Sequence, residues 1–254
     1  MDALHSLISY WLIFDHQSDE QILIGSFLFN NSNGLEVIKH QLQFAFQDNE
    51  FLFLALATVL LAGMGILMGQ NTGDSVLYFA SIRSDSLNQF FKWTNFLGEL
   101  PAFVIIGLIL LTRGYKYVVG IPVVALLVTL ITQILKKLFA HPRPALFFQA
   151  NGLSQKIIPV DGEILNMGLN SFPSGHTAAA FALFIFVALV YRGNKWVALF
   201  SVLLAILGGI SRIYLFQHFL KDVVFGATIG ILSAITCYLI VERWQVKWGR
   251  QTLF

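Results

Sequence analysis

The chain has 254 residues, of which 56% are hydrophobic and 12% are charged, and its net charge is +2. Soluble domains carry about 25% charged residues, so this composition excludes a disordered chain and an ordinary soluble enzyme and indicates a protein whose solvent is the bilayer. The small net charge gives no reason to expect a nucleic-acid partner. The single cysteine, Cys237, excludes an intrachain disulfide framework and a multi-cysteine metal cluster.

The first 50 residues differ from the rest of the chain. They hold seven of the 14 acidic residues and one lysine, Lys39. Their two apolar stretches, 4–14 and 22–29, are too short to cross a bilayer, and no basic segment precedes them as in a cleaved signal peptide. We therefore expect residues 1–50 to form an acidic segment with one or two interfacial helices.

Six apolar segments follow. Three of them lack any charge over a length that crosses the hydrocarbon core as a helix: 51–73, 117–135 and 223–241. Three are weaker, because each is short or carries a charge near one end: 96–112, 177–191 and 196–211. Core helices of a soluble bundle would show a charged face, which these segments lack. The sequence therefore predicts an all-α polytopic membrane protein, with a six-helix membrane domain at 51–242 and a basic cytoplasmic tail at 243–254.

Basic residues set the expected orientation of these helices. The turns after the second and fourth segments, 113–116 and 192–195, each hold two basic residues and no acid, and the tail holds three more. Because basic residues favour the cytoplasmic side, this pattern places both turns and the tail inside. The connections at 74–95, 140–174 and 216–222 are then expected on the opposite side.

The first group of unexpected polar residues on that side follows the third predicted helix. Lys136 and Arg143 are separated by six residues, and Pro142 and Pro144 end the helix and stiffen the chain around Arg143. A lysine here would by itself be an interfacial anchor. Ionisable groups this close to the membrane are nevertheless candidates for function.

The second group is the segment 172–176, just before the fourth predicted helix. Pro173 and Ser174 suit the start of a helix, and a helix start offers free N–H groups and a positive dipole end to an anion. Gly175 allows a ligand to approach the backbone closely. Taken alone this pattern is weak, since Ser-Gly pairs cap many helices.

The third group consists of Arg212, His218 and Asp222. The last two are four residues apart, so on one helical turn the carboxylate reaches the imidazole. Such a carboxylate fixes the tautomer of the ring and raises the basicity of its other nitrogen, which prepares a nucleophile or general base. A structural His–Asp pair at a membrane interface is the alternative interpretation.

Together the three groups are more specific than any one of them. All are expected on one side of the membrane, where three cations would repel one another unless they shared an anion. Phosphate suits such a clamp, because Arg, Lys and backbone N–H groups all bind its oxygens. One histidine would attack phosphorus and the other would protonate the leaving oxygen. The residues therefore predict phosphoryl transfer on a phosphate carried by a lipid.

These groups resemble the three signature motifs of the type 2 phosphatidic acid phosphatase superfamily, which includes membrane lipid phosphatases and vanadium-dependent haloperoxidases. Every signature position is filled, in order: Lys136, six residues, Arg143-Pro144; Pro173-Ser174-Gly175-His176; Ser211-Arg212, five residues, His218, three residues, Asp222. The resemblance covers roughly residues 74–239 and leaves the acidic first 50 residues unexplained.

The resemblance implies a role for each residue. His218 would be the nucleophile that forms a phosphohistidine, Asp222 would orient it, and His176 would protonate the departing lipid oxygen. The phosphate would be held by Lys136, Arg143, Arg212, Ser174 and the amide of Gly175. No metal or other cofactor is expected. A zinc site made by the two histidines and the aspartate is the competing use of the same atoms, and three nearby cations would oppose it.

Within the superfamily the chain resembles bacterial inner-membrane members, which have a long segment between the first and second motifs, and the resemblance implies a site that faces the periplasm or exterior. Such members act on phosphatidic acid, phosphatidylglycerol phosphate, undecaprenyl diphosphate or lipid A phosphates, so we expect the bilayer and a phosphorylated lipid as partners. Residues 145–172 should form much of the substrate entrance, with Phe147 and Phe148 either contacting lipid chains or anchoring the interface.

Three other functions use the same residues. A lipid phosphotransferase would form the same phosphohistidine and pass the phosphate to another lipid or a sugar, and the motifs do not separate it from a phosphatase. A lipid-phosphate binder or flippase would need only the cations, so His176, His218 and Asp222 argue against it. The six predicted spans disfavour a haloperoxidase.

Overall fold

The computed structural model describes residues 42, 43 and 45–248, so the expected interfacial segment at 1–50 lies almost wholly outside the described residues. All regular elements of the described part are helical, as predicted. The α-helices are α3 (Glu50–Met68), α4 (Asp74–Ser81), α5 (Asp85–Asn95), α6 (Leu100–Leu110), α7 (Tyr115–Phe139), α8 (Pro144–Ala150), α9 (Gly175–Val190), α10 (Lys195–Tyr214) and α11 (Leu220–Trp248). Short 3-10 turns are η1 (Phe96–Gly98), η2 (Leu111–Arg113) and η3 (Ser154–Lys156).

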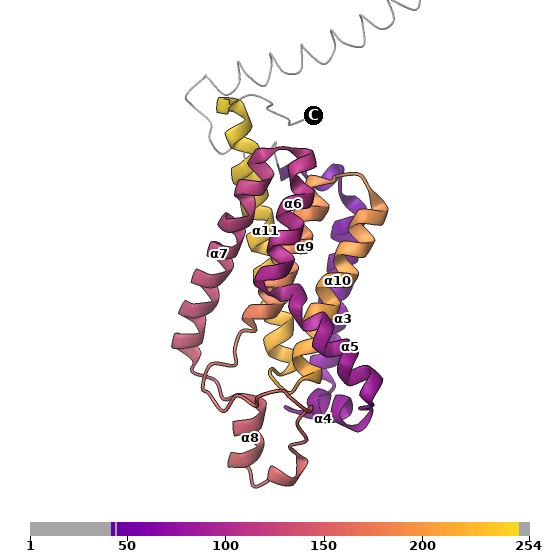
Figure 1. Ribbon diagram of the computed structural model, residues 1–254, viewed down its shortest axis with the longest axis vertical. Coiled ribbons are helices and arrows are strands. Elements are labelled where there is room, and N and C mark those ends of the chain that lie inside the picture. The colour runs from indigo at the N-terminus through magenta and orange to yellow at the C-terminus, as the bar shows by residue number, and fades with distance from the viewer. Residues whose placement is uncertain (1–41, 44, 249–254) are drawn as a thin grey trace, which may run out of the picture. The chain divides into compact units, whose positions relative to one another are not determined.

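Helix α9 is the centre around which the other helices pack. It contacts α6, α7, α10 and α11, and only Gly175, His176 and Ala179 among its residues are not buried. The longer helices run side by side, whereas the short α4 and α8 lie together at one end (Figure 1). The core is therefore a helical bundle built on one apolar helix, with the loops that join α7 to α9 and α10 to α11 at the end where α9 begins.

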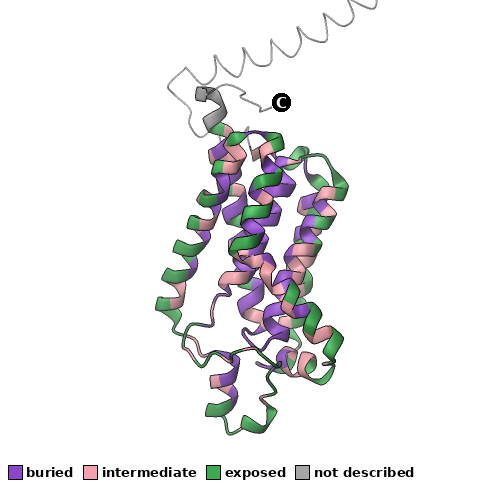
Figure 2. Cartoon of the chain, viewed as in Figure 1, coloured by how far each residue is buried: buried purple, intermediate pink, exposed green. Residues whose placement is uncertain are grey.

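The outer faces of the bundle are apolar, as expected for a protein surrounded by lipid. Along α7 four exposed side chains recur every fourth residue on one face: Leu126, Leu130, Ile134 and Leu138. Figure 2 shows exposed residues along the outer sides of the helices and buried residues toward α9. An exposed stripe of leucine and isoleucine would be poorly hydrated in water, so it indicates contact with acyl chains.

The number of membrane spans is less simple than the sequence suggests. Helices α3, α7, α10 and α11 are long and apolar enough to cross a bilayer. The second predicted span, 96–112, belongs to a bent pair, α5–η1 followed by α6–η2, whose halves meet at 60°. Helix α9 has 16 residues, about 24 Å at 1.5 Å per residue, against a hydrocarbon core of about 30 Å. Each of the six predicted segments contains a helix, although the extended Glu99 interrupts the second and α3 ends at Met68, and the count of six spans stays a prediction.

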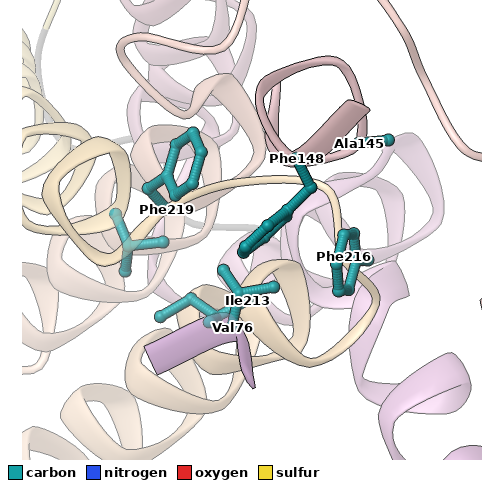
Figure 3. Close-up of a cluster of buried hydrophobic side chains, with 7 residues drawn as sticks. Val76, Ala145, Phe148, Ile213, Phe216 and Phe219 are labelled. Carbon is teal, nitrogen blue, oxygen red and sulfur yellow. The ribbon is translucent and has the colours of Figure 1, made fainter. Parts of the chain in front are cut away.

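A cluster of aromatic and aliphatic side chains lies between α8 and the end of the bundle. Phe148 is 2% exposed and packs against Phe216, with 5.6 Å between ring centroids (Figure 3). The expectation that Phe148 contacts lipid chains is therefore wrong. Phe147 is partly buried and packs edge-on against Phe219 at 5.4 Å. These rings bury the turn between α10 and α11 and so fix the backbone on which His218 stands.

Close packing of α11 on α9 depends on glycine. A Cβ on Gly230 would overlap the carbonyl oxygen of Ala178 and would lie 2.7 Å from the Cβ of Phe181 and 2.9 Å from the amide nitrogen of Ala182. Real Cβ atoms do not approach backbone atoms so closely, so any larger residue must push the two helices apart. The absence of a side chain at this position lets the two helices touch.

We expect Gly230→Ala to lower the free energy of unfolding by about 1–3 kcal/mol, because overpacking outweighs the better helix propensity of alanine. The measurement is thermal unfolding in detergent, followed by circular dichroism. Gly65→Ala in α3 is the matched control, since a Cβ on Gly65 meets nothing within 4 Å and should leave stability equal or slightly higher. Equal unfolding temperatures for both variants would contradict this packing.

Candidate active site

The structure brings the predicted site residues to one end of the bundle. Lys136 lies in the last turn of α7, Ser174 caps α9, Arg212 lies in the last turn of α10 and Asp222 in the first turn of α11. The backbone N–H of Ser174 donates to the carbonyl oxygen of Asp222 at 3.0 Å, which joins the second group of residues to the third. Helix ends that are far apart in sequence therefore meet at one point.

His218 and Asp222 form a buried pair at this point. Their side chains are 1% and 0% exposed, and Nδ1 of the imidazole lies 3.5 Å from Oδ2 of the carboxylate. Ser171 Oγ donates to the same Oδ2 at 2.5 Å and lies 3.4 Å from His218 Nδ1. The backbone N–H of Phe219 also donates to Oδ2, at 2.9 Å. Because Nδ1 faces these groups, Nε2 is the ring nitrogen left for chemistry.

A tight turn holds the imidazole in place. His218 precedes α11 and does not lie within the helix, and its N–H and that of Gln217 both donate to the carbonyl oxygen of Arg212, at 3.1 and 2.9 Å. Phe216 adopts a φ of +64°, which is uncommon for a residue with a side chain and is maintained here by its burial. Burial also lowers the pKa of His218 to about 4, so its ring is neutral at pH 7 and able to act as a nucleophile.

Arg143 is buried and held by two amide side chains. Its Nε donates to Asn170 Oδ1 at 2.8 Å, and its Nη1 donates to the side-chain and backbone oxygens of Gln217, at 3.1 and 3.3 Å. The N–H of Arg143 donates to the carbonyl oxygen of Gly168. Helix α7 ends at Phe139, before the two prolines, as the sequence predicts. Arg143 therefore occupies a fixed position next to the turn that holds His218.

Arg212 is 7% exposed and retains a free donor. Its Nη1 donates to Asn95 Oδ1. Its Nε is buried and has no hydrogen-bond partner within the described part of the chain. Buried polar groups are nearly always paired, so an unpaired guanidinium N–H facing a polar cluster is suited to an anion oxygen.

The start of α9 supplies further groups. Ser174 Oγ accepts hydrogen bonds from the N–H of Thr177 at 3.3 Å and from its hydroxyl at 2.8 Å, as expected for an N-cap. A Cβ on Gly175 would lie 3.9 Å from Lys136 Nζ, so the ammonium is beside the first turn of the helix. The free N–H groups of that turn, the helix dipole and the lysine together favour a bound anion.

His176 stands in the same first turn and is 40% exposed. Its Nε2 lies 3.5 Å from Oε1 of Glu99, which also accepts a hydrogen bond from Asn95 Nδ2 at 2.7 Å. The charges of Arg212, Lys136 and Arg143 all act on the imidazole of His176. The two histidines and the three cations therefore form one electrostatic cluster.

Three residues of this cluster were not singled out from the sequence. Glu99 interrupts an apolar segment, and that position alone makes an ionisable residue a functional candidate. Ser171 and Asn95 gave no such signal, because short polar residues are common near helix ends. Their contacts join residues 51 and 117 positions apart, and nothing local in the sequence indicates them.

Metal binding receives no support from the geometry. Among the residues that the structure describes, no three side chains of His, Cys, Asp or Glu are placed to hold an ion. The alternative zinc site at His176, His218 and Asp222 is therefore not assembled by these residues.

The profile of the PAP2 superfamily matches residues 117–245, which is half of the chain and includes all three groups. The chain belongs to the PAP2 superfamily. This confirms the family predicted from the motifs.

Two relatives and one solved structure illustrate the similarity. The PAP2 chain is 29% identical over 175 residues to a lipid A 4'-phosphatase of Bacteroides thetaiotaomicron, covering 66% of this chain and 76% of the relative. It is 27% identical over 143 residues to lipid phosphate phosphatase 2 of Arabidopsis thaliana, covering 48% and 49%. The chain thus spans about half the length of that plant relative. A transmembrane PAP2-type phosphatidylglycerolphosphate phosphatase from Bacillus subtilis superimposes with a TM-score of 0.54 and 26% identity, over 78% of this chain and 96% of the other.

These likenesses agree with the apolar outer faces of the helices. The solved neighbour is a transmembrane protein, and four helices of this PAP2 chain are long and apolar enough to cross a bilayer. The chain is an integral membrane protein with an all-helical PAP2 fold.

Proposed function

We propose that this protein is a lipid phosphate phosphatase that works through a phosphohistidine on His218 and needs no metal. The observation that carries the proposal is the buried His218, whose Nδ1 faces Asp222 and Ser171 so that Nε2 is left for chemistry. The charges of Arg143 and Arg212 act on Lys136, whose Nζ lies beside the first turn of α9. A nucleophile beside three cations suits attack on a phosphate.

The reaction has two steps. Nε2 of His218 attacks phosphorus, the bond from phosphorus to the lipid oxygen breaks, and His176 gives a proton to that oxygen as the lipid leaves. Water then attacks the phosphohistidine, His176 accepts a proton from the water, and inorganic phosphate leaves with Nε2 free again. The negative charge that spreads over the phosphoryl oxygens is stabilised by Arg143, Arg212 and Lys136 together with Ser174 and the amide of Gly175.

The position of the cluster supports a lipid substrate on the non-cytoplasmic side. The site lies where α9 and α11 begin and where α7 and α10 end, whereas the basic turns at 113–116 and 192–195 are at the opposite ends of these helices. If those turns are cytoplasmic, the site is at the outer surface of the inner membrane. Head groups of phosphorylated lipids lie at that depth, and the named relatives are phosphatases of lipid A, phosphatidylglycerol phosphate and other lipid phosphates.

The experiment is phosphate release by the purified protein in detergent with EDTA present. The substrates are phosphatidic acid, phosphatidylglycerol phosphate, undecaprenyl diphosphate and lipid A, each tested beside the His218→Ala variant. We expect release from at least one lipid with EDTA, lost in the variant, and the preferred lipid would identify the head group. Release that stops with EDTA and returns with a divalent metal would contradict the metal-independent mechanism. Release only after a lipid or sugar acceptor is added would show a phosphotransferase.

A further inference from the structure

The break in the second apolar helix places an acidic residue against the site. The halves α5–η1 and α6–η2 meet at 60°, and Glu99 is the extended residue between them, the N-cap of α6. In a straight helix through 85–113, the direction of the Glu99 side chain would be set by the helical repeat alone. The bend instead ends the first half at η1, whose backbone packs on the first turn of α9.

The contact between η1 and α9 leaves no room for a side chain. A Cβ on Gly98 would overlap the carbonyl oxygen of His176 and would lie 3.1 Å from its carbonyl carbon and 3.2 Å from its Cα. Glycine at position 98 therefore allows the two backbones to touch. This close approach sets the adjacent Glu99 beside the imidazole of His176, with 3.5 Å between Oε1 and Nε2.

The contact between Glu99 and His176 matters because positively charged side chains surround the imidazole. Arg212, Lys136 and Arg143 face the ring with positive charge, and His218 faces it as well. Burial of the ring and, after it, those cations lower the pKa of His176, yet a general acid must carry a proton. Glu99 supplies a negative charge in contact with the ring. Asn95 joins it to the phosphate clamp, because its Nδ2 donates to Glu99 Oε1 and its Oδ1 accepts from Arg212.

We propose that Glu99 is a positioning residue that holds the proton on Nε2 of His176 and turns Nδ1 toward the leaving lipid oxygen. This inference rests on the proposed phosphatase mechanism. In the first step the imidazolium gives its Nδ1 proton to the lipid oxygen as the bond from phosphorus to oxygen breaks. The ring left behind is neutral, keeps its Nε2 proton and stays paired with Glu99. The same pair then lets Nδ1 accept a proton from the attacking water.

The test compares leaving groups of different basicity. An alkyl oxygen, as in dioctanoyl phosphatidic acid, needs a proton to leave, whereas the nitrophenolate of 4-nitrophenyl phosphate leaves without one. The variant Glu99→Gln keeps the size and the hydrogen-bond acceptor of the side chain and removes its charge. The matched control is Glu163→Gln, because Glu163 also acts electrostatically on Arg212 and has no ion pair with His176.

We expect Glu99→Gln to lower kcat for dioctanoyl phosphatidic acid at least about tenfold and to change KM by less than about threefold. The loss of kcat should be smaller than the roughly 10²–10⁴-fold that general acid catalysis typically contributes, because His176 itself is still present. On 4-nitrophenyl phosphate the same variant should keep kcat within about threefold, which also shows that it is folded. Glu163→Gln should leave both rates unchanged. Adding Glu99→Gln to His176→Ala should cost nothing more, because the carboxylate acts through the ring.

Two results would overturn the inference: equal losses on both substrates, which indicate a structural role, or an unchanged rate on dioctanoyl phosphatidic acid. A further loss in the double variant would also count against it. His218→Ala separates this inference from the function on which it rests, since that variant must be inactive on both substrates. If it remains active, the nucleophile is wrong, whatever Glu99 does.

Discussion

Replacing His218 with alanine is expected to abolish phosphate release, by at least about 10⁴-fold, because enzymes that lose their nucleophile fall to the rate that binding alone supports. The imidazole is buried, neutral and directed by Asp222 and Ser171, and no other neutral nitrogen in the described cluster has this support. The measurement is steady-state release of inorganic phosphate. A denaturing quench at alkaline pH, where the P–N bond of phosphohistidine survives, should also trap phosphohistidine in the unmodified protein and not in the variant.

The control for this variant is His141→Ala. His141 lies near the same loops, where its Nε2 is 2.8 Å from Lys221 Nζ, and its carbonyl oxygen accepts from the N–H of Ser171. Alanine keeps that backbone contact, so the control should retain activity within a few-fold. Thermal unfolding of both variants in detergent separates loss of chemistry from loss of fold. Turnover that survives in His218→Ala, or phosphohistidine trapped there on another residue, would refute the assignment of the nucleophile.

Asp222→Asn is expected to lower kcat by about 10²–10⁴-fold with little change in KM. Oδ2 of Asp222 accepts from Phe219 N and Ser171 Oγ and faces His218 Nδ1, while Oδ1 is buried without a hydrogen-bond partner among the described residues. An asparagine oxygen can take the place of Oδ2, so the geometry survives and the charge is lost. When Nε2 binds phosphorus the ring becomes positive, and a buried carboxylate stabilises that charge more strongly than an amide does.

A graded comparison makes this prediction sharper. Ser171→Ala removes one donor to the carboxylate and leaves its charge, so kcat should fall only about threefold to tenfold. The order unmodified protein, Ser171→Ala, Asp222→Asn is the expected ranking of kcat, measured as phosphate release at saturating lipid. Activity of Asp222→Asn within threefold of the unmodified protein would mean that the aspartate is structural, which was the alternative interpretation of the His–Asp pair.

The residues that meet at the site were predictable because they are of types that a membrane does not tolerate without reason. Lys136, Arg143, Arg212, His218 and Asp222 stand out against apolar surroundings, and the structure gathers all five. The N-cap role of Ser174 was predictable for a local reason, since capping requires only the residues that follow it. The helical segments were predictable from the absence of charge alone.

Other features depend on contacts between distant parts of the chain. The 60° break at Glu99 and the 16-residue length of α9 both bear on whether these apolar segments cross the bilayer as single helices. Neither feature can be recognised from hydropathy. Phe148 is a residue type that often contacts lipid, yet in the structure it is covered by the turn that carries Phe216. The pairing of Ser171 with Asp222 and of Asn95 with Arg212 arises only when four helix ends converge.

The sequence alone indicated a helical membrane protein with three polar motifs suited to a phosphate, because charge is costly in lipid and the three motifs together are more specific than any one of them. The tertiary structure alone decided how these residues are supported. It turned Nδ1 of His218 toward Asp222 and Ser171, and it set Glu99 against His176 through a contact that only glycine at position 98 allows. The reason is physical: the orientation of a side chain is set by packing across the bundle, which the local sequence does not encode.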